Sequence, residues 1–281
     1  MTLFLGIDGG GTGCRAAVAD DAGRVLGFGH SGPANIASDP DTARTNILYA
    51  TQQAMTVALG ETGAARETPH LVAGLGLAGA NAAGVVGRLR LALPFAQVRI
   101  ETDAVTAARG ALAGADGIVA ALGTGSVYAV QRHGSIRCHG GWGLVLGDEG
   151  GGAWLGRNAL SLALRAVDGF AKLTPFLQQM LDDHGGAAGV VSFAQTARAA
   201  DFAQLAPRVV RSDDPAAADL WARATADVAA TLCHLRKSSP LPVTFIGGLG
   251  PSYAAALPQF PQMTAKGTAL DGALLLARDA A

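Results

Sequence analysis

Cysteine is scarce in this chain, and the few cysteines are far apart. The 281 residues include Cys14, Cys138 and Cys233, and no two of them form a CxxC pair. An odd number of distant cysteines fits neither a disulfide framework nor a thiolate zinc site, so we expect a protein of a reducing compartment, the cytoplasm. His133 and His139 flank Cys138 without a second cluster at ligand spacing, and we interpret them as turn and surface residues.

An excess of charge of either sign and long apolar runs are also lacking. Lys and Arg total 21 against 22 Asp and Glu, a net charge of -1, which argues against a nucleic-acid binder that relies on overall positive charge. The composition, 49% hydrophobic and 15% charged, excludes a disordered chain. The most apolar stretch, residues 71–87, is too short to span a bilayer comfortably, and we interpret it as buried strand and loop. The first residues lack the basic region of a signal peptide, so we expect neither export nor a membrane partner.

Glycine is abundant, with 39 residues against 9 Phe, 3 Tyr and 3 Trp, so tight turns are expected to carry much of the function. An apolar run at residues 3–7 stops at the glycine-rich segment 8–13. Further apolar runs separated by turns then predict an antiparallel meander of three strands. The segments that follow predict helices and strands in alternation: a helix over 39–59, strands over 71–77 and 98–101, and a helix over 103–112.

The pattern then begins again. A strand over 117–122, a glycine turn at 123–126 and a strand over 127–131 echo the first residues of the chain. The two Gly-Thr turns are roughly 110 residues apart, the length of a small α/β domain, so we infer a duplicated unit. The remaining elements predicted are a strand at 136–138, helices over 154–167 and 219–235, a strand over 243–246 and a helix over 268–277.

The two glycine turns are candidates for binding phosphate. A glycine hairpin exposes backbone N–H groups without side-chain obstruction, and Thr12 adds a hydroxyl donor. The alternative is a plain tight turn, but two matched turns favour phosphate. The sequence holds no GxxxxGK[ST] motif, and the first turn is followed by a strand rather than a helix, which disfavours a P-loop and a dinucleotide-binding fold.

Two aspartates follow predicted strands. Asp8 would hold Mg²⁺, directly or through water, beside bound phosphates, or it caps the turn. Asp103 would accept the proton of an attacking hydroxyl, or it is an ordinary helix N-cap. Spacing alone does not choose between these alternatives.

The segment 140–152 combines many glycines with one tryptophan and two acidic residues. Sugars are held by carboxylates that bridge hydroxyl groups and by an aromatic face, so Trp142 and Asp148 suit a polyol ligand. The alternative for Trp142 is a place in the hydrophobic core.

Seven motifs in order along nearly the whole chain resemble one family: IDGGGTG (7–13), GPANI (32–36), TDA (102–104), LGTGS (122–126), GGWG (140–143), GDEG (147–150) and IGGLG (246–250). The sequence resembles the N-acetylglucosamine kinase and glucosamine kinase group of the BadF/BadG ATPase-like family, within the superfamily of acetate kinase, sugar kinases, Hsp70 and actin. The resemblance implies an α/β fold of two ribonuclease-H-like domains, each with a mixed five-stranded sheet, flanking a central cleft. The domains expected are 1–104 with the C-terminal helix at about 266–281, and 105–265.

The resemblance also implies an ATP-dependent hexosamine 6-phosphotransferase with Mg²⁺. Asp103 would be the general base for the sugar 6-hydroxyl, and Asp8 would position the metal. The residues implied for ATP are Gly10, Gly11, Thr12, Thr124 and Gly125 at the phosphates and Gly248, Ser252 and Ala203 at adenosine. The residues implied for the sugar are Asn35, Asp103, Ser126, Gly141, Trp142, Gly143 and Asp148. Relatives are commonly dimers, so a homodimer is compatible with the resemblance.

Val127 departs from the family pattern, because the animal N-acetylglucosamine kinases carry a polar residue directly after GTGS. Glucosamine is therefore a competing substrate. An activator ATPase of the BadF type would need cysteines that bind an iron–sulfur cluster. The second glycine turn, at 122–126, contains no cysteine. A sugar-sensing regulator would be expected to lose the base or metal carboxylate or to gain a basic DNA-binding segment.

Overall fold

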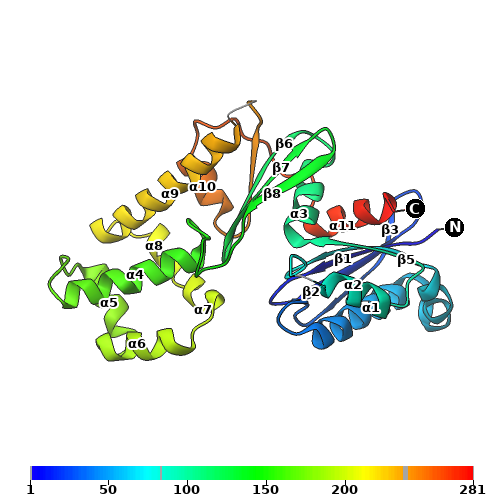
Figure 1. Ribbon diagram of the computed structural model, residues 1–281, viewed down its shortest axis with the longest axis horizontal. Coiled ribbons are helices and arrows are strands. Elements are labelled where there is room, and N and C mark those ends of the chain that lie inside the picture. The colour runs from blue at the N-terminus through cyan, green and yellow to red at the C-terminus, as the bar shows by residue number, and fades with distance from the viewer. Residues whose placement is uncertain (1, 83, 237–239, 281) are drawn as a thin grey trace. The chain divides into compact units, whose positions relative to one another are not determined.

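The computed structural model describes residues 2–82, 84–236 and 240–280, which form two compact units (Figure 1). The first unit comprises Met1–Gly117, Gln131–Cys138 and Thr264–Ala281, and the second comprises Ile118–Val130 and His139–Met263. Each unit combines one sheet with helices, so the predicted α/β class is confirmed. The domain boundaries expected at 104 and about 266 stay a prediction, and residue 281 lies outside the described residues.

In the described residues, the sheet of the first unit has five strands in the order β3-β2-β1-β4-β5. Its strands are β1 (Phe4–Gly9), β2 (Cys14–Ala19), β3 (Val25–Ser31), β4 (Val72–Leu77) and β5 (Gln97–Thr102). β1, β2 and β3 pair antiparallel, which confirms the predicted meander, whereas β4 runs parallel to both β1 and β5. The carboxyl ends of β1, β4 and β5 therefore lie at one edge of the sheet.

Helices cover both faces of this sheet because its central strands β1 and β4 are buried on both sides. Leu5 and Ile7 of β1 share a core with the long helix α1 (Pro40–Glu67), while Phe4 packs on the other side against Leu274 of α11 (Ala269–Arg278). α3 (Asp103–Leu112) packs beside α11. The unit also contains the short helices η1 (Thr68–His70) and α2 (Val85–Ala92).

Two of these helices differ from the prediction. The predicted helix over 39–59 is the first segment of α1; this segment ends at Gly60, whose φ of 71° and ψ of 170° lie outside the helical region, and the second segment of α1, up to Glu67, was not predicted. The stretch 71–87 contains the predicted strand, but α2 begins at Val85 where a loop was expected. Gly84, with a φ of 75°, precedes α2 without a side-chain cap, so the sequence carries no helix-start signal there.

The second sheet has four strands in the described part of the chain, in the order β8-β7-β6-β9. They are β6 (Gly117–Leu122), β7 (Ser126–Arg132), β8 (Ser135–Gly140) and β9 (Val243–Ile246), with β6 and β9 parallel. The sheet belongs to the second unit except for Gly117 and residues 131–138, the end of β7 and most of β8, which group with the first unit. The five strands expected for each sheet are present only in the first. Beside β9, Val243 and Gln262 form an isolated parallel bridge.

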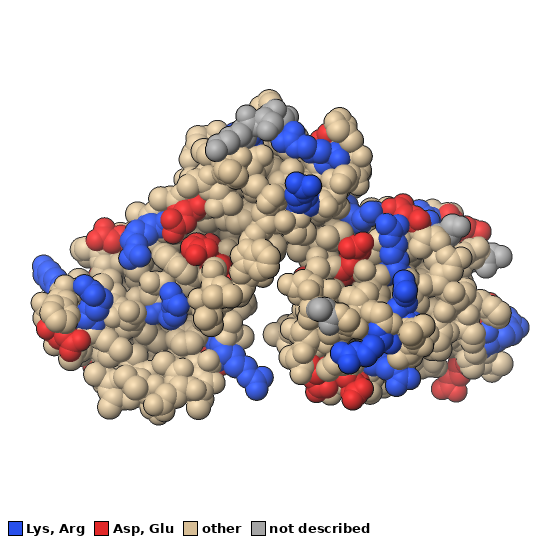
Figure 2. Space-filling view, viewed as in Figure 1, with Lys and Arg blue, Asp and Glu red and all other residues tan. Residues whose placement is uncertain are grey.

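Among the described residues, seven helices of the second unit contribute to a core that includes Leu122, Leu155 and Val228. They are α4 (Gly152–Val167), α5 (Pro175–Asp182), α6 (Gly186–Thr196), α7 (Ala199–Ala203), α8 (Ala206–Val210), α9 (Pro215–Arg236) and α10 (Gly250–Ala256). Only α4 and α9 were predicted. None of the helices among the described residues has the length and apolarity needed to cross a membrane. On the face seen in Figure 2, basic and acidic side chains are interspersed on both units.

Candidate functional site

The first glycine turn joins β1 to β2 and closes on itself. The backbone N–H of Gly10 donates to the carbonyl oxygen of Gly13, 2.8 Å away. Gly11 and Thr12 at the tip are exposed, and a Cβ added to Gly11 would meet no atom within 4 Å. The tip therefore presents backbone and hydroxyl donors to solvent, the arrangement that binds phosphate oxygens.

Asp8 lies at the end of β1, where its carboxylate contacts Arg15. The two residues face each other across the β1–β2 pair, and Arg15 Nε lies 3.1 Å from Asp8 Oδ2, with Nη2 bonded to the same oxygen. This leaves Oδ1 for a cation. One carboxylate beside a phosphate-binding turn fits Mg²⁺, which takes few protein ligands and completes its shell with phosphate oxygens and water. The described residues contain no cluster of three or more His, Cys, Asp or Glu side chains able to hold a metal.

Asp103 is the first residue of α3 and directly follows β5. Its Oδ1 accepts the backbone N–H of Ala104 at 2.9 Å, while the N-cap is Thr102, whose hydroxyl accepts the N–H of Val105. Burial raises the pKa of Asp103; the Ala104 N–H partly offsets this effect, and the negative charge of Asp8 adds to it. Asp103 is thus a carboxylate that is more basic than usual, at the same sheet edge as Asp8.

Asn35 is tied to the same edge by backbone hydrogen bonds on both sides. The N–H of Ala34 donates to Gly10 and the N–H of Ile36 donates to Ala78, just beyond β4. Its side-chain Oδ1 accepts the N–H groups of Ala37 and Ser38 at 3.0 and 3.2 Å. The amide oxygen of Asn35 is therefore engaged within the protein, and its contact with a sugar stays a prediction.

The second glycine turn joins β6 to β7 and is bonded to the start of α4. The N–H of Gly152 donates to Gly123 and that of Ala153 donates to Thr124, both at 2.8 Å. The carbonyl groups of the turn thus cap α4, and the exposed Thr124 stands at its tip. This places the hydroxyl of Thr124 at the surface of the second unit, as Thr12 is in the first.

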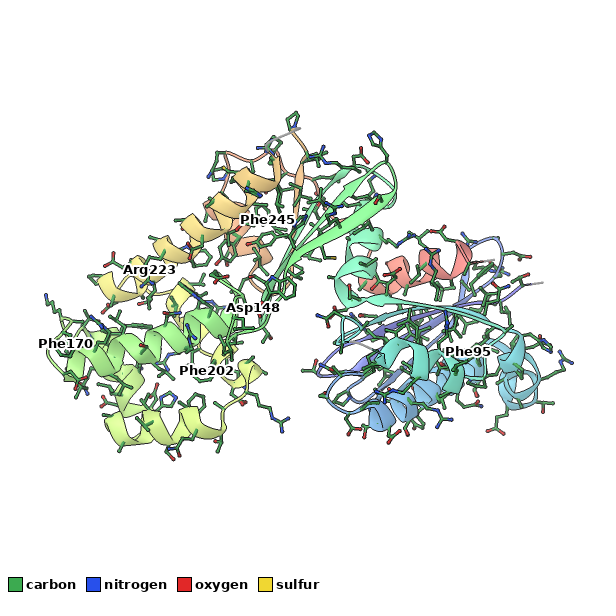
Figure 3. All side chains as sticks on the ribbon, in the orientation of Figure 1. Phe95, Asp148, Phe170, Phe202, Arg223 and Phe245 are labelled. Carbon is green, nitrogen blue, oxygen red and sulfur yellow. The ribbon has the colours of Figure 1, made fainter. Side chains whose placement is uncertain are left out.

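Asp148 connects this turn to the Gly-Gly-Trp-Gly loop. In Figure 3 it lies in the loop that leads into α4. Its Oδ1 accepts the N–H of Gly143 at 3.3 Å, and its Oδ2 lies where a Cβ on Gly125 would be. Burial raises the pKa of Asp148, and the N–H groups of Gly143 and Ser126 partly offset the rise. Asp148 has a φ of 62° and the loop contains three left-handed glycines, so its shape is defined by the backbone.

Trp142 in this loop is 71% exposed, so it is not a core residue. Ser126, by contrast, is buried at the start of β7. An exposed aromatic ring beside a carboxylate is a suitable surface for the apolar face of a sugar ring.

The residues implied for adenosine lie around the second turn. The N–H of Leu249, next to Gly248, donates to Leu122 at 2.9 Å. Ala203, at the end of α7, packs against Gly152, since a Cβ atom added to Gly152 would lie 3.2 Å from the Cβ of Ala203. Ser252 is in the first turn of α10. Gly248 and Ala203 thus lie beside the second turn and Ser252 follows in α10, and the contact of all three with adenosine stays a prediction.

The candidate residues thus form one set within each unit. The first unit groups Asp8, Gly10, Gly11, Thr12, Asn35 and Asp103; the second groups Thr124, Gly125, Ser126, Gly141, Trp142, Gly143, Asp148, Ala203, Gly248 and Ser252. Sequence reasoning missed Arg15. Residues 7–15 contain one basic and one acidic side chain, but the contact between them depends on the register of β1 and β2.

Comparison with known proteins places the chain among sugar kinases and related ATPases. It is 30% identical to the glucosamine kinase of Vibrio cholerae over 99% of this chain and 96% of that protein. It is 29% identical to the N-acetylmuramic acid/N-acetylglucosamine kinase of Clostridium acetobutylicum over 65% of this chain and 60% of that protein.

Solved structures give the same result. A proposed N-acetylglucosamine kinase of Chromobacterium violaceum superposes with a TM-score of 0.88 at 32% identity, covering 99% of each chain. Residues 5–266 match the BadF/BadG/BcrA/BcrD ATPase family. Because this match spans most of the sequence, the chain belongs to the BadF/BadG/BcrA/BcrD ATPase family.

Proposed function

We propose that this chain is an ATP-dependent amino-sugar kinase that phosphorylates the 6-hydroxyl of N-acetylglucosamine or glucosamine. The observation that carries the proposal is the position of Asp103, a carboxylate of raised pKa at the strand edge that also holds Asp8 and the first glycine turn. The chain's relatives in Vibrio cholerae and Chromobacterium violaceum each match 99% of its length, and they support an amino sugar as the substrate.

Asp103 would act as the general base. A sugar 6-hydroxyl is a weak nucleophile, and a carboxylate within hydrogen-bond reach takes its proton as the oxygen attacks the terminal phosphorus of ATP. Because Oδ1 of Asp103 accepts from Ala104, the carboxylate is held in one orientation, and Oδ2 is the oxygen that receives the proton. Attack breaks the bond between that phosphorus and the bridging oxygen, and ADP leaves.

The glycine turns would hold the phosphates. Gly11 and Thr12 would present donors from the first unit, where Gly10 closes the turn, and Thr124 and Gly125 would present donors from the second. Mg²⁺, when bound, supplies positive charge that offsets the charge of the phosphates. Asp8 would hold this ion through the oxygen that Arg15 leaves available.

The sugar would be recognised by donors and acceptors from both sets. Asn35 would donate to ring hydroxyl groups through Nδ2, because its oxygen is engaged by Ala37 and Ser38. Asp148 would accept from hydroxyl groups, with Ser126 and the backbone of residues 141–143 completing the contacts.

Two substrates remain in competition. Val127 lies next to the backbone of the loop at 140–143, because a Cβ atom added to Gly141 would be 3.2 Å from its Cγ2. Its side chain is apolar, whereas the family resemblance implies a polar residue beside this loop. This favours a glucosamine-specific kinase over one that depends on a polar contact to the acetyl group. A BadF-type activator ATPase is the second candidate function, since the family includes ATPases. Against it, the second turn contains no cysteine, and Cys14 is buried in the core of the first unit.

The test is ADP release with Mg-ATP and N-acetylglucosamine, glucosamine, glucose or no sugar. We expect release that depends on an amino sugar, with the 6-phosphate identified by mass spectrometry and NMR. Saturation with glucosamine at lower concentration than with its acetyl form would identify a glucosamine kinase. Equal release with and without sugar would contradict the kinase and favour an ATPase.

A further inference from the structure

A cavity opens in the first unit at the edge of its sheet opposite to the candidate site. Its volume is about 330 Å³, and its walls come from β2, β3, the end of α3, α11 and the segment that leads into α11. Ala19, which lines the cavity, pairs with Phe4 at the start of β1, whereas Asp8 lies near the end of that strand. The cavity is therefore separate from the first glycine turn and from Asp103.

Two basic side chains line this cavity, Lys266 before α11 and Arg278 in the last turn of α11. Among the described residues, the ammonium group of Lys266 has no hydrogen-bond or ion-pair partner. In the same part of the chain Arg278 forms no ion pair with a carboxylate. Both positive charges are thus available to a ligand.

The Arg278 guanidinium is held in one orientation. Its Nη2 group donates to the carbonyl oxygens of Asp20 and Asp21, at 3.4 and 2.7 Å, and its carbon lies 5.6 Å from the centre of the Phe4 ring. These contacts leave Nε and Nη1 without a protein acceptor among the described residues. A fixed guanidinium with donors to spare is well suited to the oxygens of a phosphate group.

The acidic side chain that lines the cavity is used by the protein itself. Oδ2 of Asp271 accepts the backbone N–H and the hydroxyl of Thr268, both at 2.7 Å, and so completes the capping box of α11. A carboxylate at this end of a helix is stabilising. Two basic side chains against one capping carboxylate leave the cavity with net positive charge.

A structural role explains Lys266 poorly. It is exposed and lies two residues before Thr268, the N-cap of α11, where the helix dipole disfavours a cation. The usual compensation would be an acidic partner, and the described residues supply none. An anion that binds in the cavity would provide it.

The rest of the wall is largely apolar. Val25, Leu274 and Leu275 line it, and Leu275 is 37% exposed although α11 packs on the sheet. Sites for small molecules combine such walls with a few polar groups and have volumes of about 300 to 1,000 Å³. The cavity thus suits a ligand that carries both an anionic group and a carbon skeleton.

We propose that this cavity binds a small phosphate monoester, with Lys266 and Arg278 on the phosphate and Leu275 against the carbon skeleton. A phosphate offers oxygens to a guanidinium fork and to an ammonium group together, and its two negative charges match the two cations. The inference is independent of the proposed function, because the cavity shares no residue with the candidate site.

The experiment is a titration of the full chain, in EDTA, with glycerol 3-phosphate, inorganic phosphate or glycerol, followed by ¹H–¹⁵N NMR. We expect saturable shifts of the amide signals of Gly23, Gly110 and Gly267, which line the cavity. Glycerol 3-phosphate should bind more tightly than inorganic phosphate, and glycerol should leave these signals unchanged. The amide signals of Gly11 and Gly125 report separately on any binding at the glycine turns.

Lys266→Met is the decisive variant, because Lys266 is exposed and makes no side-chain contact that the fold would lose. It should weaken glycerol 3-phosphate binding by about tenfold or more, the loss typical of a hydrogen bond between charged groups. Its thermal unfolding without ligand should match that of the wild type. The matched control is Lys172→Met, which removes an exposed lysine of the second unit and should bind as the wild type does.

Arg278→Met should weaken binding to a similar extent, and Arg278→Lys should recover part of the affinity because it keeps the charge without the fork. Arg278→Met also loses the contact with Phe4, so its thermal unfolding is measured beside its affinity.

Four results would overturn the inference. They are the absence of saturable shifts at the three cavity glycines, binding by Lys266→Met equal to that of the wild type, an equal loss in Lys172→Met, and inorganic phosphate binding as tightly as its ester. Assays of amino-sugar phosphorylation by the wild type judge the proposed function separately, since neither Lys266 nor Arg278 belongs to the candidate site.

Discussion

Thr102 caps helix α3 and leaves the carboxylate of its neighbour Asp103 outside the cap. The Thr102 hydroxyl accepts the N–H of Val105, whereas Asp103 bonds to the adjacent N–H of Ala104. The sequence left open whether Asp103 was a cap or a base. The structure assigns the cap to Thr102, so stability and catalysis at this helix end are separable by mutation.

Asp103→Asn should lower turnover by about two orders of magnitude or more, because asparagine has the same shape but accepts no proton. ATP binding should stay nearly unchanged, and the fold should not be weakened, since the cap is elsewhere. Turnover is measured by coupled ADP release and ATP binding by calorimetry.

Thr102→Ala is the matched control for this prediction. It should reduce the free energy of unfolding by about 1 kcal/mol, the usual cost of a lost N-cap, with turnover far above that of Asp103→Asn. If Asp103→Asn instead keeps full turnover and loses stability, Asp103 is a structural residue.

Activity should depend on pH through Asp103. Its pKa is raised, first by burial and further by the charge of Asp8, and only the ionised form accepts a proton. kcat/KM for the sugar should therefore rise with pH along an acid limb that lies above the ordinary aspartate range of about 3.9. A limb at or below that value would contradict the assignment.

Stability should show the opposite pH dependence. A carboxyl group of raised pKa favours the folded state below its unfolded pKa, and this contribution is lost as pH rises through the folded pKa. The free energy of unfolding of the wild type, relative to Asp103→Asn, should then fall as pH rises through that window. Urea unfolding of both proteins between about pH 3 and pH 7 measures this difference.

Asn35→Asp should raise the sugar KM strongly while leaving the local structure intact. Aspartate keeps the oxygen that accepts from Ala37 and Ser38 but lacks the Nδ2 donor. We expect a rise of about tenfold or more with the ATP KM within about twofold, as for the loss of a hydrogen bond to substrate. Asn35→Ala removes both functions and should also lower the melting temperature. An unchanged sugar KM in Asn35→Asp would remove Asn35 from the sugar contacts.

Much of the site was predictable because glycine turns and strand ends leave local signals. The run from Ile7 to Gly13 predicts a strand, a turn and an exposed tip from consecutive residues, and β1, the turn and β2 confirm it. Asp103 after β5 was predictable for the same reason. Contacts that depend on register were not: Arg15 meets Asp8 because β1 and β2 pair in one register, which no local pattern specifies.

The second unit was predicted less well because its short helices are held by packing. α7 and α8 have five residues each, too few for a clear apolar period. α6 begins at a left-handed glycine without a side-chain cap. α5 did carry a signal, since Thr174 caps it and Pro175 is its first residue, and that pair marks a helix start.

Trp142→Ala should raise the sugar KM without changing stability. The ring is 71% exposed, so its loss removes little buried surface and the free energy of unfolding should change by less than about 0.5 kcal/mol. Chemical unfolding and steady-state kinetics test the two statements separately. A clear loss of stability would show that the ring packs against the protein, and an unchanged KM would exclude it from sugar binding.

Thr12→Val should weaken ATP binding and leave sugar binding unchanged, because valine matches threonine in shape but has no hydroxyl to donate to a phosphate oxygen. Thr12 is exposed at the tip of the first turn, so the substitution should leave the fold intact. A loss of one hydrogen bond to a charged phosphate predicts an affinity lower by about tenfold. Calorimetry with ATP and with the sugar measures both affinities, and Thr12→Ser, which restores the hydroxyl, should recover most of the ATP affinity. Equal weakening of both ligands would indicate a disturbed turn rather than a lost phosphate contact, and the recovery by serine would then be absent.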